Sequence, residues 1–149
     1  MRSEQGKQRQ TKKFKAYGEN DTRKFALELA EKLEPGDVIA VSGDLGTGKT
    51  TFTKYIAEGL GIDENIDSPT FTIVKEHRSG KLPLFHFDVY RIGSADEFFD
   101  TGGEEYFYSD GVSVIEWAEN IEDALPEDAI RISIEYGDRE DERIFTCTY

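Results

Sequence analysis

Residues 43–50 read Gly43-Asp44-Leu45-Gly46-Thr47-Gly48-Lys49-Thr50, which matches GxxxxGK[ST], the pattern of a phosphate-binding P-loop. An apolar run, residues 38–41, precedes this segment, and a helix-compatible stretch, residues 51–58, follows it. Glycines let successive backbone N–H groups point at phosphates, and the following helix directs the positive end of its dipole at the same anions. The order of strand, loop and helix predicts a site for a nucleoside triphosphate.

The lysine and the threonine of this pattern have distinct expected roles. Lys49 is expected to contact the β- and γ-phosphates, and Thr50 to bind Mg²⁺. The other expected ATP or ADP contacts in this segment are Asp44, Leu45, Gly46, Thr47, Gly48 and Thr51. A glycine-rich loop can arise by chance, but the fixed positions together with the flanking pattern disfavour that interpretation.

The composition predicts one soluble domain. The chain has 149 residues, a length that suits a single domain with its own core. No apolar stretch approaches the roughly 20 residues of a membrane span, and residues 1–7 lack the apolar centre of a signal peptide. Cys147 is the single cysteine, which excludes an internal disulfide and suits a reducing compartment. We therefore expect a cytoplasmic protein without a membrane segment, with Cys147 as a small strand residue.

Charge is distributed unevenly along the chain. The net charge is −13, yet lysine and arginine outnumber acids by six to one in residues 1–15. An acidic body repels the phosphates of nucleic acids, so tight direct binding of RNA is not expected without a basic partner. Residues 1–15 are interpreted as a basic, disordered leader, and residues 16–149 as a single P-loop ATPase domain.

Hydrophobic periodicity indicates an α/β fold. Apolar residues recur at helical spacing across residues 25–33, after Asn20-Asp21-Thr22, whose side chains can cap a helix. Residues 94–97 have the form of a capping box and predict the start of a further, short helix. Strands are expected over residues 37–42, 70–76, 82–87, 112–115, 130–136 and 145–149. The prediction is a P-loop NTPase-like three-layer fold, with a central mixed sheet flanked by helices and a C-terminal antiparallel hairpin.

Two predicted strands end in an acid. Asp88 closes the run Leu84-Phe85-His86-Phe87, and Glu116 closes Val114-Ile115. A carboxylate at the C-terminal end of such a strand faces the bound phosphates and Mg²⁺. Asp88 is the first choice for a direct or water-mediated magnesium contact, and Glu116 is expected to bind the metal or orient the attacking water. His77 and His86 lie within or beside strands without a metal-ligand spacing, so both are interpreted as structural.

The predicted base is adenine. Guanine-reading P-loop proteins carry [NT]KxD, and the nearest match, Asn120-Ile121-Glu122-Asp123, lacks the lysine. Asp100-Thr101-Gly102-Gly103 has the form of the GTPase DxxG but follows a helix-like stretch and is read as a chance match. ATP is therefore favoured over GTP.

Four blocks in order carry a family resemblance: residues 43–52, Ser68-Pro69-Thr70-Phe71, His86-Phe87-Asp88-Val89-Tyr90-Arg91 and Ile115-Glu116-Trp117. Together they resemble the bacterial TsaE family, also called YjeE or YdiB. That family consists of small ATPases required, with the proteins TsaB and TsaD, for making threonylcarbamoyladenosine in tRNA beside the anticodon. The resemblance implies that tRNA is reached only indirectly, through the complex.

The resemblance also implies roles for individual residues. Lys49 would contact the phosphates, Thr50 and Glu116 would bind Mg²⁺, and Asp88 would be a catalytic or metal-linked acid. Thr70 would lie on a loop resembling switch I and sense the γ-phosphate. Adenine contacts are expected from the segment around Glu19.

The expected activity is Mg²⁺-dependent ATP hydrolysis, weak in the isolated chain and stimulated by partners, since no finger arginine is evident. A small-molecule kinase is an alternative, but the segment between Asp88 and Glu116 has only Arg91 as a base and suits an anionic acceptor poorly. A second alternative is a sensing switch that binds Mg-ATP without producing ADP.

Overall fold

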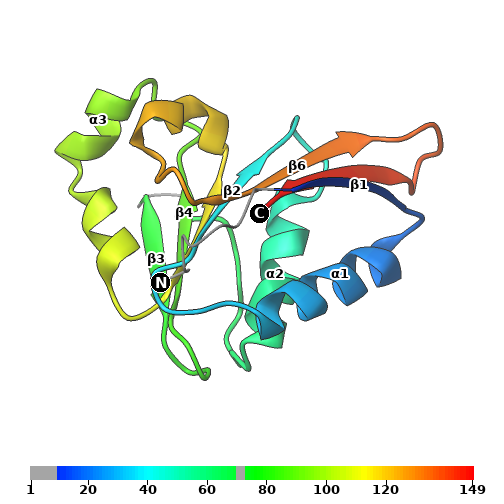
Figure 1. Ribbon diagram of the computed structural model, residues 1–149, viewed down its shortest axis with the longest axis horizontal. Helices are drawn as coiled ribbons and strands as arrows, with labels where there is room; N and C mark the ends of the chain where they lie inside the picture. The colour runs from blue at the N-terminus through cyan, green and yellow to red at the C-terminus, as the bar shows by residue number, and fades with distance from the viewer. Residues whose placement is uncertain (1–9, 70–72) are drawn as a thin grey trace.

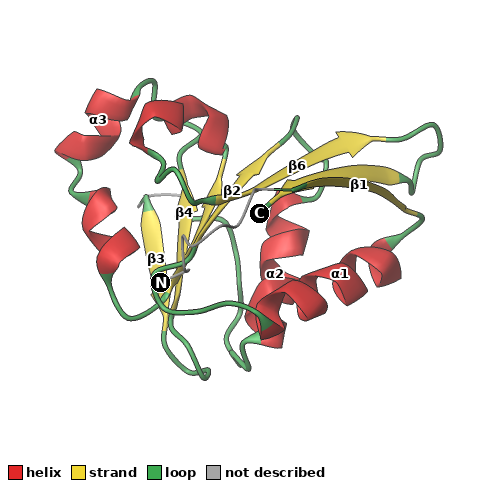
Figure 2. Cartoon of the chain, viewed as in Figure 1, coloured by secondary structure: helices red, strands yellow, loops and turns green. Residues whose placement is uncertain are grey.

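The computed structural model describes residues 10–69 and 73–149 (Figure 1). These residues form a seven-stranded sheet with the strand order β1-β7-β6-β2-β5-β4-β3. Helices lie on both faces of the sheet (Figure 2). The predicted three-layer fold with a central mixed sheet is confirmed.

The centre of the sheet is parallel. Its strands are β2 (Val38–Ser42), β4 (Leu84–Asp88), β5 (Val112–Glu116) and β6 (Ile130–Tyr136). β2 pairs in parallel with β5 and β6, and β4 pairs in parallel with β5. β2, β4 and β5 read as apolar runs because helices cover both faces of a parallel sheet. Their C-terminal ends meet at one edge, where α/β proteins place their ligands.

Two long helices cover one face of the sheet. They are α1 (Glu19–Glu31) and α2 (Lys49–Gly59). Leu29 of α1 and Phe52 and Ile56 of α2 are buried in the apolar layer between these helices and the sheet. No helix within the described ranges is long and apolar enough to cross a membrane.

Three short helices cover the other face. They are α3 (Ala95–Asp100) and the 3₁₀ helices η1 (Gly103–Tyr108) and η2 (Ala118–Ala124). Phe98 of α3 and Phe107 of η1 pack on Phe87 of β4, each with ring centroids 5.9 Å apart. Ser94 caps α3 as expected, because its side chain accepts a hydrogen bond from the Glu97 N–H.

Antiparallel strands complete both edges. β3 (Val74–His77) pairs with β4 as the predicted hairpin. β7 (Arg143–Thr148) pairs with β6, which confirms the C-terminal hairpin. The start of the first of these hairpins, residues 70–72, lies outside the described residues.

The disordered leader predicted for residues 1–15 is wrong for its last part. Residues 11–16 form strand β1 (Thr11–Ala16), which pairs antiparallel with β7. Ala16 is buried, and the ring of Phe14 stacks on Phe145 with centroids 5.1 Å apart. Phe14 and Ala16 alternate with lysines, which is the period of a strand buried on one side, and the high charge of the segment hid that pattern. Residues 1–9 lie outside the described residues.

The beginning of α1 also differs from the expectation. The helix begins at Glu19 with Gly18 as its N-cap, and no side chain caps the first turn. Gly18 has φ +146°, a conformation that glycine adopts without steric cost. Asp21 instead accepts a hydrogen bond of 2.9 Å from the N–H of Tyr17 before the helix.

Candidate functional site

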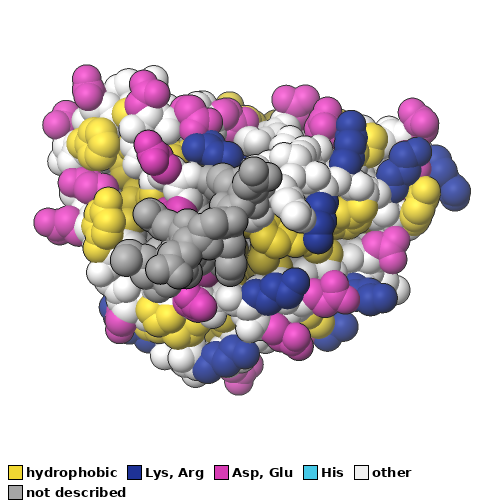
Figure 3. Space-filling model, in the orientation of Figure 1, with side chains coloured by type: hydrophobic (Ala, Val, Ile, Leu, Met, Phe, Trp, Pro, Cys, Tyr) yellow, Lys and Arg dark blue, Asp and Glu magenta, His cyan; other side chains and the backbone are white. Residues whose placement is uncertain are grey.

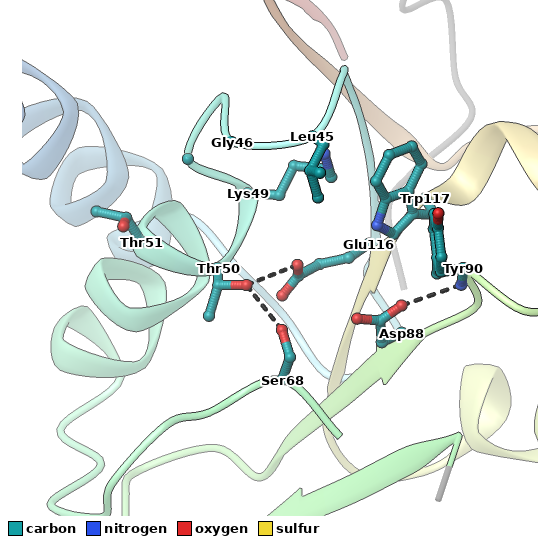
Figure 4. Close-up of a pocket in the computed structure, with 11 residues that line it drawn as sticks. Leu45, Gly46, Lys49, Thr50, Thr51, Ser68, Asp88, Tyr90, Glu116 and Trp117 are labelled. Atoms are coloured by element: carbon teal, nitrogen blue, oxygen red, sulfur yellow. Dashed lines mark hydrogen bonds between the residues drawn. The ribbon is translucent and has the colours of Figure 1, made fainter. Parts of the chain in front are cut away.

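A cleft of about 430 Å³ opens at the edge where β2, β4 and β5 end (Figure 4). The P-loop side of this cleft is lined by Leu45, Gly46, Gly48, Lys49, Thr50 and Thr51. The opposite side is lined by Ser68, Asp88, Tyr90, Glu116 and Trp117. The predicted loop and the two predicted acids therefore lie in one cavity.

Backbone geometry explains the glycines of the loop. Gly48 has φ +105° and directly precedes α2, so the chain turns into the helix through a conformation that disfavours side chains. Gly43 has φ +145°, and a Cβ there would overlap the carbonyl oxygen of Ile134 in β6. The loop thus presents the amino end of an eleven-residue helix to the cleft, which is the arrangement that attracts phosphate.

Lys49 lies in the first turn of α2 and is nearly buried. Its ammonium group donates hydrogen bonds to the carbonyl oxygens of Gly43 at 2.7 Å and Asp44 at 2.8 Å. The same group lies 3.9 Å from the ring centroid of Trp117, within the range of a cation–π interaction. Burial lowers the pKa of Lys49, and the neighbouring carboxylates, Glu119 and Glu116 foremost, oppose that shift.

Thr50 connects the P-loop helix to two other segments. Its hydroxyl donates a 2.8 Å hydrogen bond to Oε1 of Glu116 and lies 2.8 Å from the hydroxyl of Ser68 (Figure 4). Glu116 is only 2% exposed. Oxygen atoms from α2, β5 and the segment after α2 thereby meet at one point.

Asp88 lies beside this group but does not share its hydrogen bonds. The strand register pairs Asp88 with Glu116, while the Asp88 carboxylate accepts a 3.0 Å hydrogen bond from the N–H of Tyr90. Burial raises the pKa of Asp88 and the charge of Glu116 adds to the rise, whereas the Tyr90 N–H opposes it. Asp88 is therefore a half-buried carboxylate that faces the cleft without a bond to Thr50.

The oxygen atoms in the cleft fit a hard divalent cation. Mg²⁺ prefers a few carboxylate or hydroxyl oxygens and takes its remaining ligands from water and phosphate. Thr50, Ser68, Glu116 and Asp88 supply such oxygens. Within the described ranges, no group of three or more His, Cys, Asp or Glu side chains is placed to hold a metal ion. A magnesium ion in this cleft would therefore need water or phosphate oxygens among its ligands.

Two aromatic side chains lie at the cleft beside the acids. Trp117 follows Glu116 and has φ +64°, a left-handed conformation that is uncommon for a large residue. Its ring lies 4.8 Å from that of Tyr90, measured between centroids. Backbone outliers of this kind concentrate at functional sites.

Two residues expected to contact nucleotide, Asp44 and Thr47, also take part in hydrogen bonds that hold the loop. The carbonyl of Asp44 accepts hydrogen bonds from Lys49 and from the hydroxyl of Thr47. The carbonyl of Thr47 accepts a 3.1 Å hydrogen bond from Nε of Arg143 in β7. The structure thus places the side chain of Thr47 within the loop itself.

The other two residues expected to contact nucleotide are Glu19 and Thr70. Glu19 begins α1, and its carboxylate accepts a 2.8 Å hydrogen bond from the hydroxyl of Tyr55. It is not among the cleft residues. Thr70 lies outside the described residues.

Sequence reasoning assigned no site role to Ser68, Tyr90, Trp117 or His86. Nε2 of His86 lies 2.5 Å from Oε2 of Glu116, although the sequence suggested only a structural role for this histidine. The available signal was proximity to known candidates, since His86 and Tyr90 both lie two residues from Asp88. Contacts between strands depend on register, which the sequence pattern did not supply.

Comparisons with known proteins give one consistent result. The family model described as "Threonylcarbamoyl adenosine biosynthesis protein TsaE" matches residues 16–145. A protein of Bacillus subtilis (strain 168) named tRNA threonylcarbamoyladenosine biosynthesis protein TsaE is 49% identical over 136 residues, covering 91% of this chain and 85% of the relative. A protein of the same name from Treponema pallidum (strain Nichols) is 46% identical over 114 residues, covering 76% of this chain and 84% of the relative.

The solved structures agree with these relatives. The crystal structure of YdiB from Bacillus subtilis superposes with a TM-score of 0.81 at 41% sequence identity. The match covers 96% of this chain and 88% of the YdiB chain.

Proposed function

The chain belongs to the TsaE family of threonylcarbamoyl adenosine biosynthesis proteins, and from that premise we propose that it is a Mg²⁺-dependent ATPase. It acts with TsaB and TsaD in the threonylcarbamoyl modification of tRNA adenosine beside the anticodon. The observation that carries the proposal is the hydrogen bond between Thr50 and Glu116, which joins the P-loop helix to an acid at the end of a neighbouring strand. A P-loop NTPase needs a hydroxyl and an acid at this point to hold magnesium against the phosphates.

The P-loop binds the phosphates of ATP. The amides of the loop and of the first turn of α2 donate hydrogen bonds to phosphate oxygens. Lys49 exchanges its bonds to the Gly43 and Asp44 carbonyls for bonds to the β- and γ-phosphates. Magnesium, when bound, supplies positive charge that neutralises the phosphate oxygens.

The two acids divide the remaining work. Glu116 and Thr50 share a hydrogen bond and face the magnesium position, whereas Asp88 faces the cleft separately. Asp88 therefore orients the attacking water and accepts its proton. The water oxygen forms a bond to the γ-phosphorus as the bond to the bridging oxygen of ADP breaks, which yields ADP and inorganic phosphate.

Hydrolysis by the isolated chain is slow because the site is incomplete. Lys49 is the only basic residue among the described residues that line the cleft. An arginine that stabilises the transferring phosphoryl group accelerates such reactions by ~10³–10⁵. A partner supplies the missing charge or closes the cleft, and tRNA is reached only through that complex.

The test is release of ADP and of inorganic phosphate from Mg-ATP, measured for this chain alone and with purified TsaB and TsaD. Lys49→Ala is the control. We expect ADP and phosphate to be released in equal amounts. The rate of release should rise when TsaB and TsaD are added and should be lost in the Lys49→Ala control. ADP without phosphate would indicate a kinase, and ATP binding without either product in the presence of the partners would indicate a sensing switch. Turnover that the partners leave unchanged would contradict the proposed coupling.

A further inference from the structure

His86 is a completely buried polar residue in the middle of β4. Its neighbours Phe85 and Phe87 point into the apolar layer under the three short helices. Side chains alternate along a strand, so His86 points to the other face, the face of Asp88. The register places His86 opposite Val114 of β5, two residues before Glu116 on that strand.

The imidazole ring has one polar partner among the described residues. Nε2 lies 2.5 Å from Oε2 of Glu116, whereas the buried Nδ1 has no hydrogen-bond partner in this part of the chain. A carboxylate accepts hydrogen bonds, so Nε2 carries the ring proton and donates the hydrogen bond to Glu116. Burying Nδ1 without a partner costs stability, so the bond to Glu116 is the polar contact that holds this ring in place.

The two oxygens of the Glu116 carboxylate have different hydrogen-bond partners. Oε2 is held by His86 and Oε1 by the hydroxyl of Thr50. These two contacts, made on opposite oxygens, fix the rotation of the carboxylate group. Without His86, the carboxylate could rotate about its terminal bond and Oε1 would no longer be directed at Thr50.

We propose that His86 is a positioning residue that directs Oε1 of Glu116 toward the magnesium position beside Thr50. This rests on the proposed function, in which Thr50 and Glu116 hold magnesium. Groups that orient a metal-binding side chain in this way typically account for ~10–100-fold in metal affinity or activity. His86 contributes through Glu116 and touches neither the nucleotide nor the metal.

The chain offers a matched control in His77. This residue is also buried, and its Nδ1 lies 3.0 Å from Oε1 of Glu64. Neither His77 nor Glu64 lines the cleft. The protein contains two histidines and one tryptophan, and that tryptophan, Trp117, touches Lys49, so its fluorescence reports binding of phosphates.

The experiment measures ATP affinity by Trp117 fluorescence across a magnesium titration and in EDTA, for His86→Leu, His86→Asn, His86→Gln and His77→Leu. Leucine removes the donor, and asparagine is too short to reach Glu116. Both are expected to raise the magnesium concentration needed for tight binding by ~10–100-fold while leaving affinity in EDTA unchanged. Glutamine reaches Glu116 with its amide and is expected to restore most of the effect. His77→Leu is expected to change neither value.

A second measurement uses the metal-free protein. Histidine side-chain ¹⁵N spectra distinguish the two tautomers, and the two rings are assigned by comparison with His77→Leu. The wild-type ring of His86 is expected to carry its proton on Nε2. A proton on Nδ1 would overturn the proposal, even if the leucine variant fails to fold.

The outcomes separate this inference from the function on which it rests. If wild-type protein binds ATP equally well with magnesium and with EDTA, the proposed magnesium site itself is wrong. If wild type shows the magnesium effect and the folded asparagine or leucine variant retains it in full, His86 has no positioning role. Loss of the effect in the asparagine variant and its recovery in the glutamine variant supports the proposal.

Discussion

The ammonium group of Lys49 is already engaged before any phosphate arrives. It is bonded to two carbonyls of its own loop and lies against the ring of Trp117. In the proposed function, phosphate oxygens would replace these contacts, so the affinity for ATP would reflect a difference between two sets of interactions. The loop carbonyls provide hydrogen bonds to the buried ammonium group, which lowers the cost of burying its charge. The same hydrogen bonds fix the conformation of the loop.

The two acids are expected to respond differently to neutral substitution. Glu116→Gln weakens the magnesium-dependent part of ATP binding by ~10–100-fold, because Glu116 is bonded to Thr50 at the metal position. Asp88→Asn keeps magnesium-dependent binding and lowers partner-stimulated turnover by ~10²–10⁴-fold, the range of general acid–base contributions. Titration of ATP affinity against magnesium, together with single-turnover hydrolysis, separates the two effects.

The assignment of roles is contradicted if the phenotypes are exchanged. An Asp88→Asn protein that loses the magnesium effect but hydrolyses bound ATP normally would make Asp88 the metal ligand. Thr51→Ser is a suitable control, because Thr51 lines the cleft and keeps its hydroxyl.

Among the strands, β1 is the one that sequence reasoning overlooked. Its place in the sheet depends on Phe14, whose ring stacks on Phe145 and lies 4.8 Å from Phe25, measured between centroids. Phe14→Ala is expected to lower the free energy of unfolding by about 2 kcal/mol, less than the roughly 3–5 kcal/mol of a fully buried phenylalanine. The neighbouring Lys13 is exposed, and Lys13→Ala is expected to change stability by at most about 0.5 kcal/mol.

Urea unfolding followed by circular dichroism measures both variants. Equal and negligible effects of the two substitutions would mean that residues 11–16 contribute nothing to the sheet in solution. A change in the slope of the transition, without a change in its midpoint, would instead show that the compactness of the denatured or native state had changed or that unfolding was no longer two-state.

The elements that the sequence did predict have a strong local signal. β2, the P-loop and α2 form one uninterrupted pattern of apolar run, glycines and helix. The two strands of the C-terminal hairpin each alternate between apolar and polar residues. β1 was missed because it gains its stability from β7, a partner more than a hundred residues away in the chain. Sequence periodicity cannot show such a partner.

The residues of the site also fall into those that the sequence predicts and those that it does not. Asp88 and Glu116 could be predicted because each is the acid that ends an apolar strand. His86 and Ser68 could not, because each acts on a residue in another element, across 30 and 18 positions respectively. Their roles follow from the strand register and from the path of the chain after α2, which are properties of the folded sheet.

On the scale of the whole molecule, charge determines which partners can be bound directly. The net charge is −13 although residues 1–15 are basic, and on the face shown in Figure 3 acidic side chains lie among lysines and arginines. The excess of negative charge repels the RNA backbone. A complex with tRNA therefore needs another component that provides the positive surface.

The chain of 149 residues is expected to show no specific affinity for tRNA. At physiological salt, any dissociation constant should be no tighter than the non-specific range of ~10⁻⁴–10⁻⁶ M, as measured by fluorescence anisotropy with labelled tRNA. Binding at low salt should depend on the basic leader and disappear when residues 1–9, which include Arg2, Lys7 and Arg9, are removed. Tight, salt-resistant binding by the chain alone would contradict the indirect role of tRNA.

The position of β7 has a consequence for the order in which the sheet can be assembled. β7 is the last strand in the chain, yet it lies between β6 and β1, the first. As a ribosome synthesises the protein, β1 has no edge to join until residues 143–148 have been made, and one backbone edge of β6 stays unpaired for as long. Pairings so distant in sequence slow folding, and unpaired strand edges attract other chains. A nascent chain that stops short of β7 would therefore be a target for chaperones and proteases, although its P-loop had already been translated.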